Sequence, residues 1–157
     1  MRTKSSGKAL FTGMVLLALI APISFGMGDR EGSETRCLMC GMDAAESETM
    51  FVLELRGERE MYACCLNCAD QLMDRLGDDF ISMTISDFGS RKQVAAAAAY
   101  YVEGSEVIPR GSMFPFLPAF GAREDAEALV RKSGGRILSY EEALELCREH
   151  RRKIHRR

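Results

Sequence analysis

Residues 50–85 read MFVLELRGEREMYACCLNCADQLMDRLGDDFISMTI, and the order of patterns in this stretch decides the fold. Residues 50–55 are apolar, with β-branched and aromatic members, which predicts a strand. Gly57 follows in a short polar turn, and residues 60–64 fit the returning strand of a hairpin. The stretch therefore begins with two antiparallel strands.

A helix and a third strand complete the stretch. Residues 66–76 carry Leu72 and Leu76 at helical spacing, and Gly77 is a natural C-terminal stop. Residues 80–85 alternate apolar and polar side chains, which predicts a strand. The predicted order is β-β-α-β.

The second half of the chain can be interpreted in the same way. Residues 95–102 fit either a helix or a strand, and residues 113–120, which contain two prolines, fit an edge strand or an ordered loop. A helix is predicted over residues 123–132 and a short strand over 136–140. A last helix, which opens with a capping-box pattern, is predicted to run from residue 139 to about residue 153.

These patterns predict an α+β fold of two small β-β-α-β units packed together, preceded by an apolar N-terminal helix. The predicted parts are a signal peptide or membrane anchor (1–28), a linker (29–36), a cysteine-rich metal-binding unit (37–90), a second unit (91–147) and a basic tail (148–157).

The N-terminus has the features of an export signal. Lys4 and Lys8 precede 20 uncharged, mostly apolar residues, 9–28. Small residues permit cleavage after Gly26, but the apolar run is almost long enough to span a bilayer. A cleaved signal and an uncleaved inner-membrane anchor both stay open, and in either case we expect a periplasmic or extracytoplasmic body.

Five cysteines mark the first unit. Cys37 and Cys40 form one CxxC pair, Cys65 and Cys68 form another, and Cys64 precedes the second pair. Two CxxC pairs are the usual way to place four thiolates around one soft metal ion. An exported protein can instead form disulfides, but a CxxC disulfide closes too small a loop to stabilise much. Structural disulfides and thiol–disulfide exchange are the alternatives to a metal.

The available donors favour copper. The only histidines, His150 and His155, lie in the last eight residues, so the site is rich in sulfur and poor in imidazole. Such a site favours Cu(I), with Zn(II) as the alternative. Met42 is either a weak extra ligand or a core methionine. The predicted metal-site residues are Cys37, Cys40, Met42, Cys64, Cys65 and Cys68.

The partner of Cys68 stays open. Cys64, Cys65 and Cys68 lie where a strand is predicted to meet a helix, and the amides of a first helical turn lower thiol pKa values. Position 68 is one helical turn from both other positions. We favour Cys65 as its partner, with Cys64 as the alternative.

Composition argues against catalysis and nucleic-acid binding. The body lacks histidine, so it offers no Cys–His nucleophile, and no phosphate loop or dinucleotide fingerprint is present. Residues 27–147 carry 12 Lys/Arg and 22 Asp/Glu, a net charge of −10, which attracts cations and repels nucleic acid. Residues 148–157 carry six Lys/Arg and one Glu, a net charge of +5, and fit a solvated helix end or a docking strip.

Several motifs, taken in order, resemble the NosL family over roughly residues 37–145. They are Cys37-Leu-Met-Cys40-Gly41-Met42, Ser86-Asp87-Phe88, Ala99-Tyr100-Tyr101-Val102-Glu103-Gly104-Ser105, Ala119-Phe120 and Ser133-Gly134-Gly135-Arg136-Ile137-Leu138-Ser139-Tyr140. The resemblance implies two β-β-α-β units and an exported, often membrane-tethered accessory protein that delivers Cu(I) to nitrous oxide reductase or another exported copper enzyme. It maps the family's copper ligands onto Cys37, Cys40 and Met42.

The chain also departs from that family's pattern. The lipid-anchored cysteine of many members is absent, and the cluster of three cysteines at 64–68 is extra. Cys40, Cys64 and Cys68 are similar to the cysteine set of a TRASH-type heavy-metal domain. We predict a Cu(I) chaperone that is not an enzyme. The alternatives are a zinc-stabilised, TRASH-like interaction or heavy-metal-binding module and a thiol–disulfide oxidoreductase.

Overall fold

A computed structural model describes residues 35–156. The predicted signal or anchor, residues 1–28, and all but the end of the predicted linker lie outside the described residues. Within residues 35–156, none of the helices has the length and apolar character needed to cross a bilayer.

The first sheet is antiparallel and has the strand order β2-β1-β3-β4. β1 (Phe51–Leu55) and β2 (Arg59–Ala63) form the predicted hairpin, with Gly57 at φ 78° in the turn. β3 (Phe80–Ser86) pairs with the other edge of β1, and β4 (Gln93–Ala95) pairs with β3. The first sheet therefore ends at Ala95, five residues past the predicted end of the first unit at residue 90.

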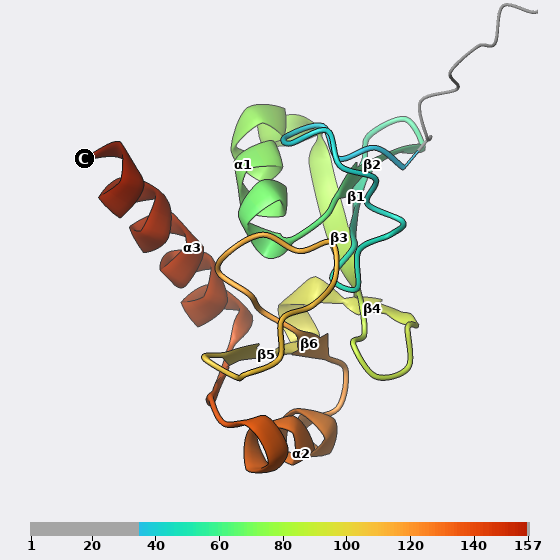
Figure 1. The fold of residues 1–157 in the computed structure, drawn as a ribbon. Coiled ribbons are helices and arrows are strands. Elements are labelled where there is room, and N and C mark those ends of the chain that lie inside the picture. The colour runs from blue at the N-terminus through green and yellow to red at the C-terminus, as the bar shows by residue number, and fades with distance from the viewer. Residues whose placement is uncertain (1–34, 157) are drawn as a thin grey trace, which may run out of the picture. The chain divides into compact units, whose positions relative to one another are not determined.

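α1 (Leu66–Leu76) follows β2 and packs against both the first sheet and α3 (Figure 1). Its buried face includes Cys68, Asp70 and Leu72, and a 3-10 turn, Gly77–Asp79, leads from it into β3. Since Cys65 is the N-cap of α1, the predicted cysteine cluster lies at the start of this helix.

The second sheet has the order β6-β5-β7 and is also antiparallel. β5 (Tyr100–Glu103) lies between β6 (Ala119–Phe120) and β7 (Arg136–Leu138). α2 (Arg123–Ser133) packs against all three strands, at the end of the molecule away from α1 (Figure 1). Residues 95–102, which fitted either a helix or a strand, contain a 3-10 turn, Ala96–Ala98, followed by most of β5.

α3 (Tyr140–His155) connects the two halves, because it contacts α1 as well as β5 and β7. It opens with the predicted capping box: the Glu142 amide donates to the Ser139 hydroxyl (3.3 Å), and the Ser139 amide donates to the Glu142 carboxylate (2.7 Å). Most of the basic tail, residues 148–157, belongs to this helix.

The predicted α+β class is confirmed: the described residues form two small sheets and three α-helices. One cluster of buried side chains runs through both halves and includes Phe51 and Leu53 from the first sheet and Tyr101 and Leu138 from the second. The five cysteines of the first unit include four members of this core.

Candidate metal centre

The first cysteine pair lies in a compact loop that closes on itself. The Cys37 amide donates to the carbonyl of Met42, and the Gly41 amide donates to the carbonyl of Cys37, both at 2.8 Å. Gly41 has φ 76°, a left-handed conformation that favours glycine. This loop buries Cys37 completely and leaves Cys40 exposed.

The second group of cysteines lies where β2 ends and α1 begins. The amides of Cys68 and Ala69 donate to the carbonyl of Cys65 at 3.1 and 3.0 Å, which starts the helix. The chain turns between the extended Cys65, with φ −160° and ψ 166°, and the first helical residues. Cys64, Cys65 and Cys68 are all at most 2% exposed.

Two hydroxyls hold the backbone at Cys64 in place. Ser47 and Thr49 donate to the Cys64 carbonyl at 2.6 and 2.9 Å, and both are 1% exposed. The sequence patterns assigned no role to Ser47 and Thr49. The signal available was a pair of hydroxyl residues next to the first cysteine pair, which is too common a pattern to single out.

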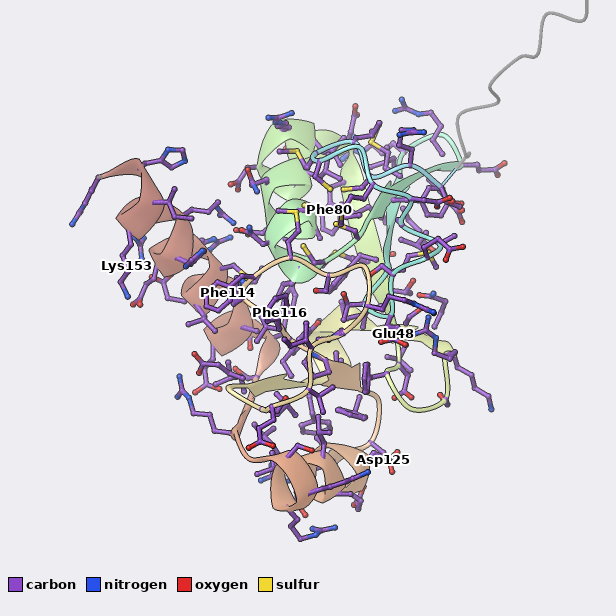
Figure 2. All side chains as sticks on the ribbon, in the orientation of Figure 1. Glu48, Phe80, Phe114, Phe116, Asp125 and Lys153 are labelled. Carbon is purple, nitrogen blue, oxygen red and sulfur yellow. The ribbon has the colours of Figure 1, made fainter. Side chains whose placement is uncertain are left out.

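Four thiols converge. The sulfur atoms of Cys37, Cys40, Cys64 and Cys68 all lie within 4.8 Å of one another. The Sγ atom of Cys64 is 3.4 Å from that of Cys40 and 3.8 Å from that of Cys68. Sulfur atoms gather beside α1 in Figure 2, where they are yellow. All six cysteines of the chain lie in the described part and are free thiols.

The donor set fits a soft, thiophilic cation. Four bonds of about 2.3 Å in a tetrahedron would set the sulfurs about 3.8 Å apart. The observed separations need only small side-chain movements to reach that arrangement or a three-coordinate one. The four thiols could thus hold one Cu(I) or Zn(II) ion, with Cys40 on its solvent side.

Hydrogen bonds within the cluster distribute its protons unevenly. Thiol hydrogen bonds from Cys64 and Cys68 hold the pKa of Cys37 far below its usual range, although burial opposes this. The same hydrogen bond to Cys37, together with burial, raises the pKa of Cys64. One thiolate is therefore stabilised by neighbours that stay protonated, so the cluster offers a cation both negative charge and displaceable protons.

Four of the six predicted metal-site residues form the four-thiol group. Cys64 rather than the favoured Cys65 belongs to the four-thiol group, and the Cys65 sulfur lies outside it, 3.8 Å from the Cys64 sulfur. Met42 is half-buried and packs against the core, beside the cluster. Cys147 is buried on α3, and burial raises its pKa to about 12.

Comparisons with known proteins identify a matching family and a similar solved structure. The sequence model of the NosL family matches residues 32–145. No curated protein matches the chain. The crystal structure of the copper chaperone NosL from Shewanella denitrificans is similar, with a TM-score of 0.58 and 20% identity over 70% of this chain and 90% of that chain. At this identity the likeness concerns the fold.

Proposed function

Because the chain belongs to the NosL family, we propose that it binds Cu(I) through Cys37, Cys40, Cys64 and Cys68 and delivers it to a partner. The family membership predicted from the sequence is confirmed by the family match. The observation that carries the proposal is the convergence of these four thiols to within 4.8 Å. The similar solved structure is that of a copper chaperone.

The chemistry of the donors favours cuprous ion as cargo. Thiolates are soft ligands that select Cu(I) and zinc, and the described residues before α3 contain no imidazole. Cu(I) is held by only two or three sulfurs, so a closed tetrahedral shell need not be dismantled during transfer. Met42, at the edge of the loop that carries Cys37 and Cys40, supplies a weak additional thioether.

Copper passes to the acceptor at Cys40. It is the one exposed thiol of the group. A thiol or imidazole of an acceptor can reach the ion from this side, join its coordination shell and displace Cys40 first. Transfer is then a series of ligand exchanges in which copper stays Cu(I), and the protein is a carrier rather than an enzyme.

The acceptor we propose is an exported copper enzyme, such as nitrous oxide reductase. The support comes from the N-terminal sequence, in which two lysines precede the apolar residues 9–28. That segment places the body in the periplasm or another extracytoplasmic space, and an uncleaved segment tethers it to the inner membrane.

Metal binding can be tested with the full chain purified without oxygen. We expect it to take Cu(I) from a chromophoric chelator, and the double variant Cys64→Ser/Cys68→Ser to lose most of that ability. Cys147→Ala, a buried cysteine outside the four-thiol group, is the matched control and should bind as the wild type does. Failure of the wild type to take up Cu(I) would overturn the proposal.

A structural zinc site is the second candidate, because four thiols at these separations also suit tetrahedral zinc. A structural zinc contributes directly to folding, so chelation should unfold the domain. If the metal is instead copper that the protein carries and releases, chelation should leave the protein folded, with its far-ultraviolet circular dichroism spectrum unchanged.

A further inference from the structure

Cys65 is a fifth thiol that the four-thiol group does not use. It is 2% exposed, and its sulfur lies 3.8 Å from that of Cys64. Cys64 is therefore in contact with Cys65 as well as with Cys40 and Cys68, of which only the last two belong with it to the four-thiol group.

We propose that the cluster holds two Cu(I) ions that share Cys64 and Cys68. The outer ion is bound by Cys37, Cys40 and the shared sulfurs, and the inner ion by Cys65 and the shared sulfurs. This inference rests on the proposed function, because it assumes that the thiols bind Cu(I). A thiolate has several lone pairs and can bridge two ions, while Cu(I) needs only two or three sulfurs.

The surroundings of Cys65 differ from those of a merely structural cysteine. Cys147, also buried, has no sulfur within hydrogen-bonding distance among the described residues. The Cys65 sulfur instead lies 3.8 Å from that of Cys64, a member of the four-thiol group. It also lies at the N-terminus of α1, an eleven-residue helix whose dipole stabilises negative charge there.

The charge and proton balance favours two ions over one. Each thiol that becomes a ligand releases its proton to solvent, and each bound Cu(I) returns one positive charge without any electron transfer. If all five sulfurs bind as thiolates, a single ion leaves one more buried negative charge than two ions do. Two ions reduce that cost, which is large at a site as buried as Cys64, Cys65 and Cys68.

The two ions would differ in accessibility. The outer ion has the exposed Cys40 among its ligands, whereas the three sulfurs of the inner ion are at most 2% exposed. The outer ion is then the cargo that a partner removes. The inner ion remains and keeps Cys64 and Cys68 in position for reloading.

The stoichiometry of the full chain tests the proposal. The chain is loaded with Cu(I) without oxygen and analysed by native mass spectrometry and X-ray absorption. We expect two ions per chain and copper–copper scattering. Saturation at one ion would overturn the two-ion site and leave the proposed function intact, whereas no uptake at all would overturn both.

Two variants locate the ions. Cys65→Ser and the double variant Cys37→Ser/Cys40→Ser should each bind one ion instead of two, but the chelator should remove the ion quickly from Cys65→Ser and slowly from the double variant. Cys147→Ser is the control and should keep both ions. Two ions bound to Cys65→Ser, or equal removal rates in the two variants, would contradict the assignment. If the buried substitutions unfold the protein, the exposed Cys40 offers a milder change: Cys40→Ser should release one of its two ions faster than the wild type does, and an unchanged rate would contradict the assignment.

Discussion

At the scale of single residues, Asp87 ties the end of the first sheet to the chain that enters α2. Its carboxylate is 5% exposed and accepts hydrogen bonds from the amides of Ser90 (2.6 Å) and Gly121 (2.7 Å). Burial acts to raise the pKa of Asp87, but these amides outweigh it and hold the pKa below its usual value. The ionised form is thus the one that the fold stabilises.

Replacing Asp87 with Asn should destabilise the protein in a pH-dependent way. At neutral pH we expect a loss of about 2 kcal/mol, because the amide cannot satisfy both buried N–H groups as a carboxylate does. Since the folded pKa lies below the unfolded one, the contribution is complete above the ordinary pKa of 3.8 and disappears as the pH falls through the folded value. Urea unfolding at neutral and acid pH measures the difference, and an equal deficit at both would contradict this account.

Gly134 and Gly135 offer a matched pair of substitutions at the end of α2. Both have positive φ, 72° and 97°, but a side chain at Gly134 meets nothing within 4 Å, whereas a Cβ at Gly135 would lie 2.5 Å from the carbonyl oxygen of Glu103. Gly134→Ala should cost about 1 kcal/mol of backbone strain. Gly135→Ala adds a backbone clash of about 1–3 kcal/mol, so its melting temperature should fall further, and equal effects would argue against close approach as the cause.

At this scale all four converging cysteines could be predicted, while the partner of Cys68 stayed open between Cys65, which we favoured, and Cys64, which joins the four-thiol group. Cys64 and Cys65 are adjacent, so a change of phase where β2 meets α1 exchanges their directions. That phase depends on the hydrogen bonds from Ser47 and Thr49 to the Cys64 carbonyl. These contacts cross 15 to 17 residues of sequence, which no local pattern specifies.

At the scale of elements, the packing of α3 on α1 centres on Asp70. This carboxylate is fully buried and accepts hydrogen bonds from Arg148 (2.7 Å for its closest nitrogen) and from Arg151. Arg151 also donates to the Asn67 side chain at 2.7 Å. Asp70 lies two residues after Cys68 on α1, so the same contacts that dock α3 also hold the helix that carries a proposed ligand.

Replacing both arginines that pair with Asp70 should lower the stability of the folded protein. Arg148→Met with Arg151→Met leaves the Asp70 carboxylate buried without a counter-ion, which costs about 3–5 kcal/mol. Adding Asp70→Asn should restore part of that loss. The control is Arg152→Met on the same helix: its pair with Glu145 is more than half exposed, so it should change stability by about 1 kcal/mol or less. Chemical unfolding measures all three, and a small effect of the double change would contradict the buried-charge argument.

Most elements could be predicted because their patterns are local. The hairpin around Gly57, α1 with its glycine stop and the capping box of α3 each depend on residues a few positions apart. β4 could not be predicted, since a three-residue strand exists only through its pairing with β3. β6 lies at the end of residues 113–120, for which an edge strand and an ordered loop both stayed open, and its pairing with β5 makes it a strand. The basic residues 148–155 belong to a docked helix because Asp70, far away in sequence, accepts from two of them.

At the scale of the whole described molecule, the two sheets share one core. Phe51 from the first sheet and Tyr101 from the second belong to the same cluster of buried side chains, and α3 contacts both halves. Sequence repetition suggested two units, but one large cluster of buried side chains takes residues from both, beside a smaller cluster of Val102, Phe120 and Ala126 in the second half. We therefore expect one cooperative unfolding transition, with coincident circular dichroism and fluorescence curves; two separated transitions would contradict a shared core.

Copper binding should stabilise this single unit as a whole. The proposed ligands come from two segments that are far apart in sequence, the loop with Cys37 and Cys40 and the start of α1 with Cys64 and Cys68, so the ion closes a link that the unfolded chain lacks. An ion that binds only the folded state adds about 4 kcal/mol at a free concentration about a thousand times its Kd. Anaerobic thermal unfolding should thus shift upward on loading with Cu(I), while the double variant Cys64→Ser/Cys68→Ser shows little shift and Cys147→Ala shifts as the wild type does. An equal shift in the double variant would place the copper elsewhere, because that variant lacks two buried members of the four-thiol group.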